Sequence, residues 1–365
     1  MDAPRLLFVS GEYPPDVGGV GDYTQHLQRA LAAVGWPSHV LSRRDVRRWD
    51  ARSLVHLLRR APTGPGIVHI QYQPAAFDLL GDVCLMPAVL GVLRPRLRVV
   101  TTFHDVRVPY LFPKAGRLRW QAVRLLARTS GAVVAADERD LAALGGAAQR
   151  AYQVPIGSNV ACAPPPGYDR AAMRARLGIT DLGLVYFGLL NSSKGLEALL
   201  DAFSVILERR PRARLLVLGG AAGASDPTDR AVAAHLAGRL DAFGERIVRP
   251  GFLGAEALSA HLLAADVALL PYLDGASPRR GSLLACAAHG LPIVSAAPVS
   301  AAVAAAVLGV PPTDAPALAA AALRVADDAA LQARLRAGSR ALAERTGWPS
   351  IAAAHAALYH TLLDR

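Results

Sequence analysis

Four polar stretches of the chain have residue types and spacings that suit ligand binding, and each follows a short apolar run. They are Pro14–Tyr23, Thr101–Asp105, Tyr186–Glu197 and Asp274–Ser282. Glycines in such loops let backbone N–H groups approach a ligand, and a helix that begins there favours an anion at its N-terminus. Three of the four stretches contain glycine and precede a helical pattern. They predict a site for an anionic ligand.

The first two stretches offer backbone and histidine donors. Gly18 and Gly19 precede a helical pattern, but their spacing is not GxGxxG, so the dinucleotide fingerprint fails. A tight turn without a ligand is the alternative interpretation. His104 follows a strand-like run and is predicted to donate to a sugar hydroxyl or an oxyanion. A histidine that only caps the next segment is the alternative there.

The last two stretches carry the cations. Lys194 is one of only two lysines in the chain and lies beside the start of a helical pattern. A lysine there is disfavoured by the positive helix end, and an anionic ligand would explain its presence. The loop is not a Walker A motif. Arg279 and Arg280 can bind phosphate bidentately, and Ser282 can help cap the helix after them. The alternative is a solvated basic loop.

Composition narrows the class of protein. The chain has 365 residues, 52% of them hydrophobic and 19% charged, which predicts two packed domains and excludes a disordered chain. Residues 1–160 carry 20 basic and 12 acidic side chains, a net +8, whereas residues 161–365 carry 20 and 17, a net +3. The excess predicts attraction of phosphates or acidic lipid by the first half. Nucleic acid is the weaker option, because no basic helix with interleaved aromatics occurs.

The sequence lacks the motifs of metal-binding, secreted and membrane-spanning proteins. No CxxC, HExxH or Cys/His ligand spacing is present, which predicts a reduced cytoplasmic protein without a structural metal. The N-terminal apolar run is too short for a signal peptide. Gly281–Thr313 contains no charged residue, but prolines interrupt it. We therefore expect a buried helix, strand and helix there rather than a membrane span.

Short apolar runs alternate with helical patterns along the whole chain. This alternation predicts βαβ units around parallel sheets, an α/β fold with two doubly wound domains. We expect one domain at residues 1–160 and another at 168–345, with the Pro-rich stretch Cys162–Gly167 between them. Ligands bind at the carboxyl ends of such strands, so we expect the site in a cleft between the two domains.

Taken in order, these motifs resemble those of the GT-B-fold glycosyltransferases, specifically the retaining, nucleotide-sugar-dependent family 4. The likeness rests on Pro14–Tyr23, Phe103–His104, Phe187–Gly195, Arg249–Leu253 and Leu283–Pro292. It implies two Rossmann-like domains facing a central cleft and a final helix, 347–365, that crosses back to the N-terminal domain. The implied reaction moves a hexosyl unit from a nucleotide diphosphate sugar to an acceptor with retention. We expect no metal or other cofactor, because Lys194, Arg279, Arg280 and helix N-termini can offset the diphosphate charge and the sequence shows no carboxylate metal site.

The resemblance and the loops together assign residues to roles. His104 and Lys194 are expected to be catalytic, with His104 steadying a donor-sugar hydroxyl. The donor diphosphate is expected to be bound by Gly18, Gly19, Gly188, Asn191, Lys194, Arg279 and Arg280. The donor sugar is expected to contact His104, Ser277, Gly281 and Ser282, and the base to contact Gly251, Phe252 and Leu253.

The chain departs from the family pattern at three positions. Leu189 stands where the family has an arginine after the glycine of the diphosphate loop. Ser277 and Ala285 stand where it has two glutamates, eight positions apart, near the donor sugar and the ribose. We expect Arg279 and Arg280 to supply the lost phosphate charge, although arginines cannot replace hydrogen-bond acceptors.

Three alternatives stay open at this point. A nucleotide-sugar epimerase of the same fold would turn over donor without an acceptor. A non-catalytic protein with a degenerate donor site would bind the sugar nucleotide only. The missing acidic pair favours this alternative, whereas the retained loops and Lys194 oppose it. A peripheral enzyme at the inner face of an acidic membrane is a variant of the main prediction. The expected partners are a nucleotide sugar and a sugar, lipid-linked or small-molecule acceptor, with no nucleic acid.

Overall fold

The computed structural model describes residues 5–16, 18–106, 108–109, 116–136, 138–144, 146–188, 194–219 and 227–364. The chain divides into two compact units. The first runs to Asn159 and resumes at Gly347, whereas the second spans Val160–Thr346. The Pro-rich stretch predicted to lie between two domains is part of the second unit, where the Ala163 N–H donates to Ser259 Oγ at 3.0 Å.

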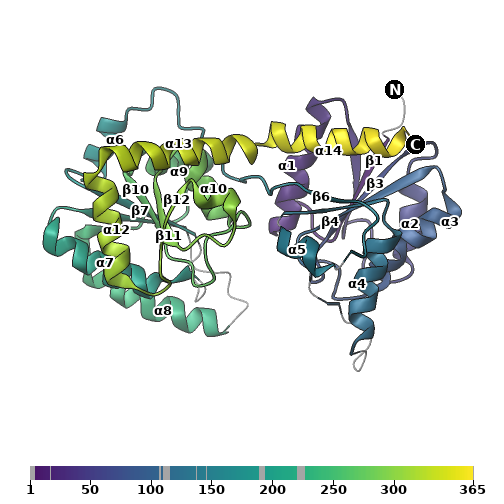
Figure 1. Cartoon of the computed structure of the whole chain (residues 1–365), viewed down its shortest axis with the longest axis horizontal. Helices are drawn as coiled ribbons and strands as arrows, with labels where there is room; N and C mark the ends of the chain where they lie inside the picture. The colour runs from purple at the N-terminus through teal and green to yellow at the C-terminus, as the bar shows by residue number, and fades with distance from the viewer. Residues whose placement is uncertain are drawn as a thin grey trace. The chain divides into compact units, whose positions relative to one another are not determined.

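The first unit is a six-stranded parallel sheet in the order β2-β1-β3-β4-β5-β6, with helices on both faces (Figure 1). Its strands are β1 (Leu6–Ser10), β2 (Ser38–Leu41), β3 (Gly66–Tyr72), β4 (Leu97–Phe103), β5 (Ala132–Ala135) and β6 (Ala151–Gln153). Its helices are α1 (Gly19–Ala33), α2 (Ser53–Arg60), the 3-10 helix η1 (Asp82–Leu85), α3 (Met86–Leu93), α4 (Leu118–Thr129), α5 (Glu138–Ala143) and α14 (Trp348–Leu363).

Alternation along the strands builds two cores, one on each face of this sheet. Leu7 and Val9 of β1 join a core that includes residues of α2, α3 and α4. Leu6 and Phe8 join a core with α1 and α14. The Tyr359 hydroxyl of α14 lies 2.6 Å from Nδ1 of the buried His69 on β3. The last helix of the chain is therefore an integral part of the first unit.

The second unit repeats the architecture, with the strand order β12-β11-β10-β7-β8-β9 and parallel pairing between the described neighbours. Its strands are β7 (Gly183–Phe187), β8 (Arg214–Leu218), β9 (Ile247–Val248), β10 (Val267–Leu270), β11 (Ile293–Ala296) and β12 (Val307–Val310). Its helices are α6 (Arg170–Arg176), α7 (Leu196–Arg209), α8 (Pro227–Ala242), the 3-10 helix η3 (Gly244–Arg246), α9 (Ala255–Ala264), α10 (Gly281–Ala288), α11 (Ala301–Ala304), α12 (Ala315–Asp327) and α13 (Ala329–Arg345). Two doubly wound sheets confirm the predicted fold class.

One part of the predicted element order is wrong. The apolar segment that ends at Thr313 was expected to finish in a helix, but α11 is only one turn long and β12 follows it. Alanine favours helix in isolation, yet Val307 and Val310 pair in parallel beside β11, where β-branched side chains pack well. Sheet pairing outweighs local helix propensity here.

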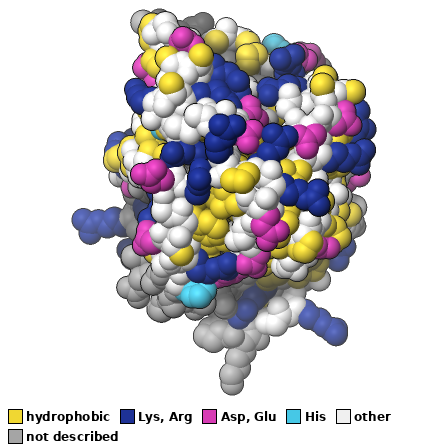
Figure 2. Space-filling model, turned by 90° about the vertical axis from the view of Figure 1, so that its left-hand side faces the viewer, with side chains coloured by type: hydrophobic (Ala, Val, Ile, Leu, Met, Phe, Trp, Pro, Cys, Tyr) yellow, Lys and Arg dark blue, Asp and Glu magenta, His cyan; other side chains and the backbone are white. Residues whose placement is uncertain are grey.

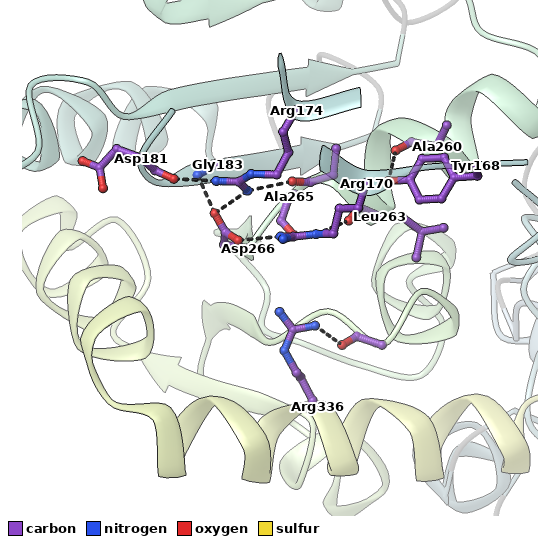
Figure 3. Close-up of polar contacts among 12 residues, drawn as sticks. Tyr168, Arg170, Arg174, Asp181, Gly183, Ala260, Leu263, Ala265, Asp266 and Arg336 are labelled. Carbon is purple, nitrogen blue, oxygen red and sulfur yellow. Dashed lines mark hydrogen bonds and ion pairs between the residues drawn. The ribbon is translucent and has the colours of Figure 1, made fainter. Parts of the chain in front are cut away.

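Charged contacts tie together the amino-terminal ends of β7 and β10. The Asp266 carboxylate accepts from Arg170 at 2.6 Å, from Arg174 at 2.8 Å and from the Gly183 N–H at 2.8 Å (Figure 3). The same two arginines also donate to carbonyls at the end of α9. These contacts occupy the arginines in holding α6, α9 and the sheet together, so this edge is structural.

Charge is mixed on the surface of this unit. Figure 2 shows basic and acidic side chains interspersed on one face of the second unit. Ion pairs of this unit include Arg210 with Asp181 at 3.1 Å. Interspersed charges of both signs produce no strong field of a single sign. The predicted excess of positive charge therefore concerns the first half of the sequence rather than this face.

Candidate functional site

Glycines bring the loops at the carboxyl edge of the second sheet into backbone contact. Gly188 follows β7 and Gly219 follows β8, and a Cβ on Gly219 would overlap the Gly188 carbonyl. Gly195, the N-cap of α7, has φ +67°, and its Cβ would overlap the carbonyl oxygen of Pro271 after β10. These close approaches place the start of α7 directly beside the loop that leaves β10.

Gly195→Ala is expected to lower Tm, because alanine at a left-handed φ costs roughly 1–2 kcal/mol and the Pro271 carbonyl leaves no room for the methyl group. Gly251→Ala is the matched control, since Gly251 also has a positive φ (+77°) but open space around its Cβ. Thermal unfolding of both variants compares them. An equal fall in Tm would contradict the backbone contact at Gly195.

Two cations gather over one buried aromatic ring at this edge. Lys194 Nζ lies 5.1 Å from the centroid of the Tyr272 ring, and Arg280 Cζ lies 4.8 Å from it. Tyr272 is fully buried, and its hydroxyl lies 2.6 Å from Ser282 Oγ. The carboxylate of Asp274 pairs with Arg280. The structure thus joins the predicted cations of two separate loops.

The electrostatics of this group favour an anionic ligand. Burial lowers the pKa of Lys194 to about 8; the nearby Arg280 acts in the same direction and Asp274 opposes it. Burial raises the pKa of the Tyr272 hydroxyl, so the ring stays neutral. A diphosphate would compensate both cations, and charge-assisted contacts with it would be strong.

The two adjacent arginines differ in position. The Arg280 side chain is only 16% exposed, whereas Arg279 is exposed. Arg280 is the N-cap residue of α10 and Gly281 its first residue, and no side chain caps this helix. The prediction that Ser282 caps it is therefore wrong: its hydroxyl is paired with Tyr272 instead. The Arg280 N–H donates to the Ser277 carbonyl at 3.1 Å.

The remaining predicted residues of this unit lie as follows. Gly251, Phe252 and Leu253 come after β9, at the same edge of the sheet, and Phe252 is 97% exposed. Leu253 packs partly against the core. Ala285 is fully buried on α10. Asn191 and Leu189 lie outside the described residues.

His104, in the first unit, is held by a glutamine that sequence reasoning missed. Its Nε2 lies 2.8 Å from Oε1 of the buried Gln71, the penultimate residue of β3. An amide oxygen only accepts, so Nε2 carries the proton. The Tyr23 ring meets the His104 ring edge-on at 4.8 Å between centroids. Gln71 and Tyr23 thus fix the position of the His104 ring at the end of β4.

The glycine loop before α1 already faces a carboxylate. Gly18 is the N-cap of this helix, and a Cβ on it would overlap the Glu12 carboxylate, whereas Gly19 has open space. Burial raises the pKa of Glu12; Arg43 opposes this, and Asp16 adds to it. An anion at this helix end would meet the negative charge of Glu12 when that side chain is ionised.

Tyr272, Gln71 and Glu12 were not singled out by sequence reasoning, although a signal for them exists. All three follow or end a predicted strand, at the carboxyl edge where α/β ligands bind. Among the described residues, no group of three or more His, Cys, Asp or Glu side chains could hold a metal ion. No helix within the described ranges is both long and apolar enough to cross a bilayer.

Comparison with known protein families finds a match within the second unit. Residues 181–328 match the sequence profile of the family described as Glycosyl transferases group 1. The match covers less than half of the chain and lies within the second unit. It contains Lys194, Tyr272, Asp274 and Arg280, so the cluster of cations lies inside the matched region.

Solved structures show the same GT-B fold over nearly the whole chain. Sucrose-phosphate synthase from Thermosynechococcus elongatus has a TM-score of 0.70 at 20% identity and covers 99% of this chain and 100% of its own. Anabaena HepE in complex with UDP has a TM-score of 0.70 at 15% identity, covering 98% and 100%.

A curated relative matches a shorter segment. Mannosylfructose-phosphate synthase of Agrobacterium fabrum is 32% identical over 120 residues, covering 29% of this chain. The match spans only 26% of the length of that relative.

Proposed function

We propose that the protein is a glycosyltransferase that moves a hexosyl unit from a nucleoside diphosphate sugar to a hydroxyl acceptor, with retention and without a metal. The observation that carries this proposal is the pair of cations, Lys194 and Arg280, over Tyr272 in a glycosyl transferases group 1 domain. UDP-glucose is the first donor to test. HepE has been solved with it, and an E. coli neighbour was solved with UDP-2-fluoro glucose.

The chemistry requires stabilisation of a leaving diphosphate. The bond from the anomeric carbon to the diphosphate oxygen breaks, and the acceptor oxygen bonds to the same face of the sugar. The hydroxyl proton of the acceptor passes to the leaving diphosphate. Lys194 and Arg280 offset the negative charge that grows on it, as preorganised cations do in transition states. His104 is proposed to hold a hydroxyl of the donor sugar.

Turnover of UDP-glucose with a panel of sugar and polyol acceptors tests the proposal. We expect UDP release that depends on acceptor and a glucoside with the α configuration of the donor, read by NMR. Lys194→Met should abolish release. A new sugar nucleotide formed without acceptor would identify an epimerase, and tight binding without any turnover would identify a binding protein. Either result would contradict transfer.

Activity is expected to survive EDTA, because Lys194, Arg280 and the N-termini of α7 and α10 supply the positive charge that a metal provides in other enzymes. UDP release is measured after chelation and again after adding Mg²⁺ or Mn²⁺. Loss of turnover in EDTA that either cation restores would contradict metal independence. The same preparation without chelator is the control.

We also propose that the first unit docks on acidic lipid. Val92 and Leu93 at the end of α3 are 79% and 56% exposed, and arginines 94 and 96 follow them. A surface hollow of about 430 Å³ between η1 and α4 is lined partly by leucines 85, 118 and 125. Exposed apolar groups beside arginines suit a negatively charged membrane surface.

Flotation with phosphatidylglycerol vesicles is expected to recover the protein at low salt and to fail at high salt, because salt screens surface charge. Val92→Glu should reduce recovery. Val34→Glu is the matched control, since Val34 is also exposed (46%) but lies at the end of α1. Equal recovery with neutral vesicles, or equal loss in both variants, would argue against docking through α3.

A further inference from the structure

The proposed diphosphate site draws its two cations from different parts of the second unit. Lys194 and Arg280 come from different loops, before α7 and at the start of α10, yet both lie about 5 Å from the centre of the Tyr272 ring. Burial of Lys194 and repulsion by Arg280 both lower the Lys194 pKa, so bringing the two charges together costs free energy. Some feature of the protein must therefore hold them in place.

Tyr272 has the properties needed to hold Lys194 and Arg280 in place. Its side chain is fully buried, so the ring has little freedom to move. Its hydroxyl is fixed by Ser282 Oγ at 2.6 Å, and Ser282 lies on α10 next to the arginine's own helix start. The negative face of an aromatic ring attracts cations without carrying a charge of its own. It therefore fixes both cations and does not compete with a bound anion.

Asp274 supplies the only carboxylate described in contact with this pair. It pairs with Arg280, whose side chain is 16% exposed, while Asp274 itself is 68% exposed. It lies in the short loop between β10 and α10, where Gly275 has φ +88°. An ion pair made by an exposed carboxylate contributes little free energy, so breaking it has a small free-energy cost. A diphosphate carries more charge and can bind both cations at once.

We propose that Tyr272 is a positioning residue for the diphosphate site, and that Asp274 is a counter-ion which the incoming diphosphate displaces from Arg280. This rests on the proposed function, because a nucleoside diphosphate sugar is the ligand. It goes beyond that function by naming what holds the two cations in place and which contact the ligand replaces. Asp274 thereby lowers the affinity for diphosphate, whereas Tyr272 raises it.

Calorimetric titration with UDP and with inorganic pyrophosphate tests both roles. We expect Asp274→Asn to bind either probe three- to tenfold more tightly at low salt, with a smaller gain at high salt. Tyr272→Leu should weaken UDP at least tenfold while uridine binding is unchanged, and Tyr272→Phe, which keeps the ring but loses the contact with Ser282, should weaken UDP less than Tyr272→Leu does. Weaker binding by Asp274→Asn, or unchanged binding by a folded Tyr272→Leu, would overturn the proposal.

A second readout requires no nucleotide. The chain has two lysines, Lys114 and Lys194, so reductive ¹³C-methylation gives two side-chain NMR signals, assigned with Lys194→Arg. We expect Asp274→Asn to lower the pKa of Lys194 and pyrophosphate to raise it. No change in either case would overturn the proposal even if Tyr272→Leu does not fold. If pyrophosphate raises the Lys194 pKa and Asp274→Asn lowers it but no nucleotide binds, the counter-ion role of Asp274 stands and the proposed function fails.

Discussion

Arg280→Ala is expected to weaken UDP binding 10- to 100-fold, whereas Arg279→Ala should change it less than about threefold. A charge-assisted contact contributes about 1.5–3 kcal/mol, which corresponds to that loss for one arginine. The two residues are adjacent and chemically identical, but only Arg280 is largely buried and over the Tyr272 ring. Calorimetry with UDP and with uridine measures the effect, and uridine should bind all variants alike.

A rescue variant makes this test sharper. Leu189 stands where the family has arginine, so Leu189→Arg in the Arg280→Ala background should recover part of the lost affinity. If both alanine variants bind UDP normally, the arginines form a solvated pair and do not compensate for Leu189. If Arg279→Ala causes the larger loss, the assignment of Arg280 is wrong.

UDP affinity is expected to fall as pH rises above about 8, because Lys194 then loses its proton. A bound diphosphate favours the charged lysine, so affinity is flat below its pKa in the free protein and drops up to tenfold per pH unit above it. The phosphates of UDP are already fully ionised in this range. Lys194→Arg should keep a flat profile to pH 9.5, which calorimetry can follow.

Lys194 is expected to lower the free energy of unfolding when no anion is bound beside it. The pKa of Lys194 is lower in the folded than in the unfolded chain, so folding is disfavoured while the lysine is charged, and stability rises with pH between about 8 and 10.5. After allowance for solvent screening, the cost at neutral pH is on the order of 1 kcal/mol. Lys194→Met should thus raise Tm by about 2–4 °C while losing UDP. A fall in Tm would contradict the assigned burial cost.

Most of the fold could be predicted because apolar periodicity and loop chemistry agree along the chain. Strand-like runs such as Val267–Leu270 are fully buried in the structure, as their composition indicates. The exceptions are short pieces at sheet edges. β6 has only three residues with partly exposed side chains, and β12 follows an alanine run that favours helix. In β6 and β12, pairing with a neighbouring strand determines the structure. The local sequence of each segment does not indicate this pairing.

The residues of the candidate site could be predicted from the sequence, but their arrangement in space could not. Lys194 and Arg280 stand out in the sequence because a lysine or arginine at a helix start needs an anion. Their meeting over Tyr272 depends on contacts between residues far apart in the sequence, such as Gly195 against Pro271. The difference between Arg279 and Arg280 has the same origin, because neighbouring positions in a loop receive opposite exposures only after it packs.

The central claim is that the second unit binds the diphosphate of a sugar nucleotide through Lys194 and Arg280. Calorimetric titration of the wild-type chain and of Arg280→Ala with UDP, GDP and ADP tests it most directly. We predict that one of the three binds the wild type clearly better than the others, and that Arg280→Ala weakens that nucleotide 10- to 100-fold. Absence of binding by all three, or equal affinity of the wild type and Arg280→Ala, would contradict it.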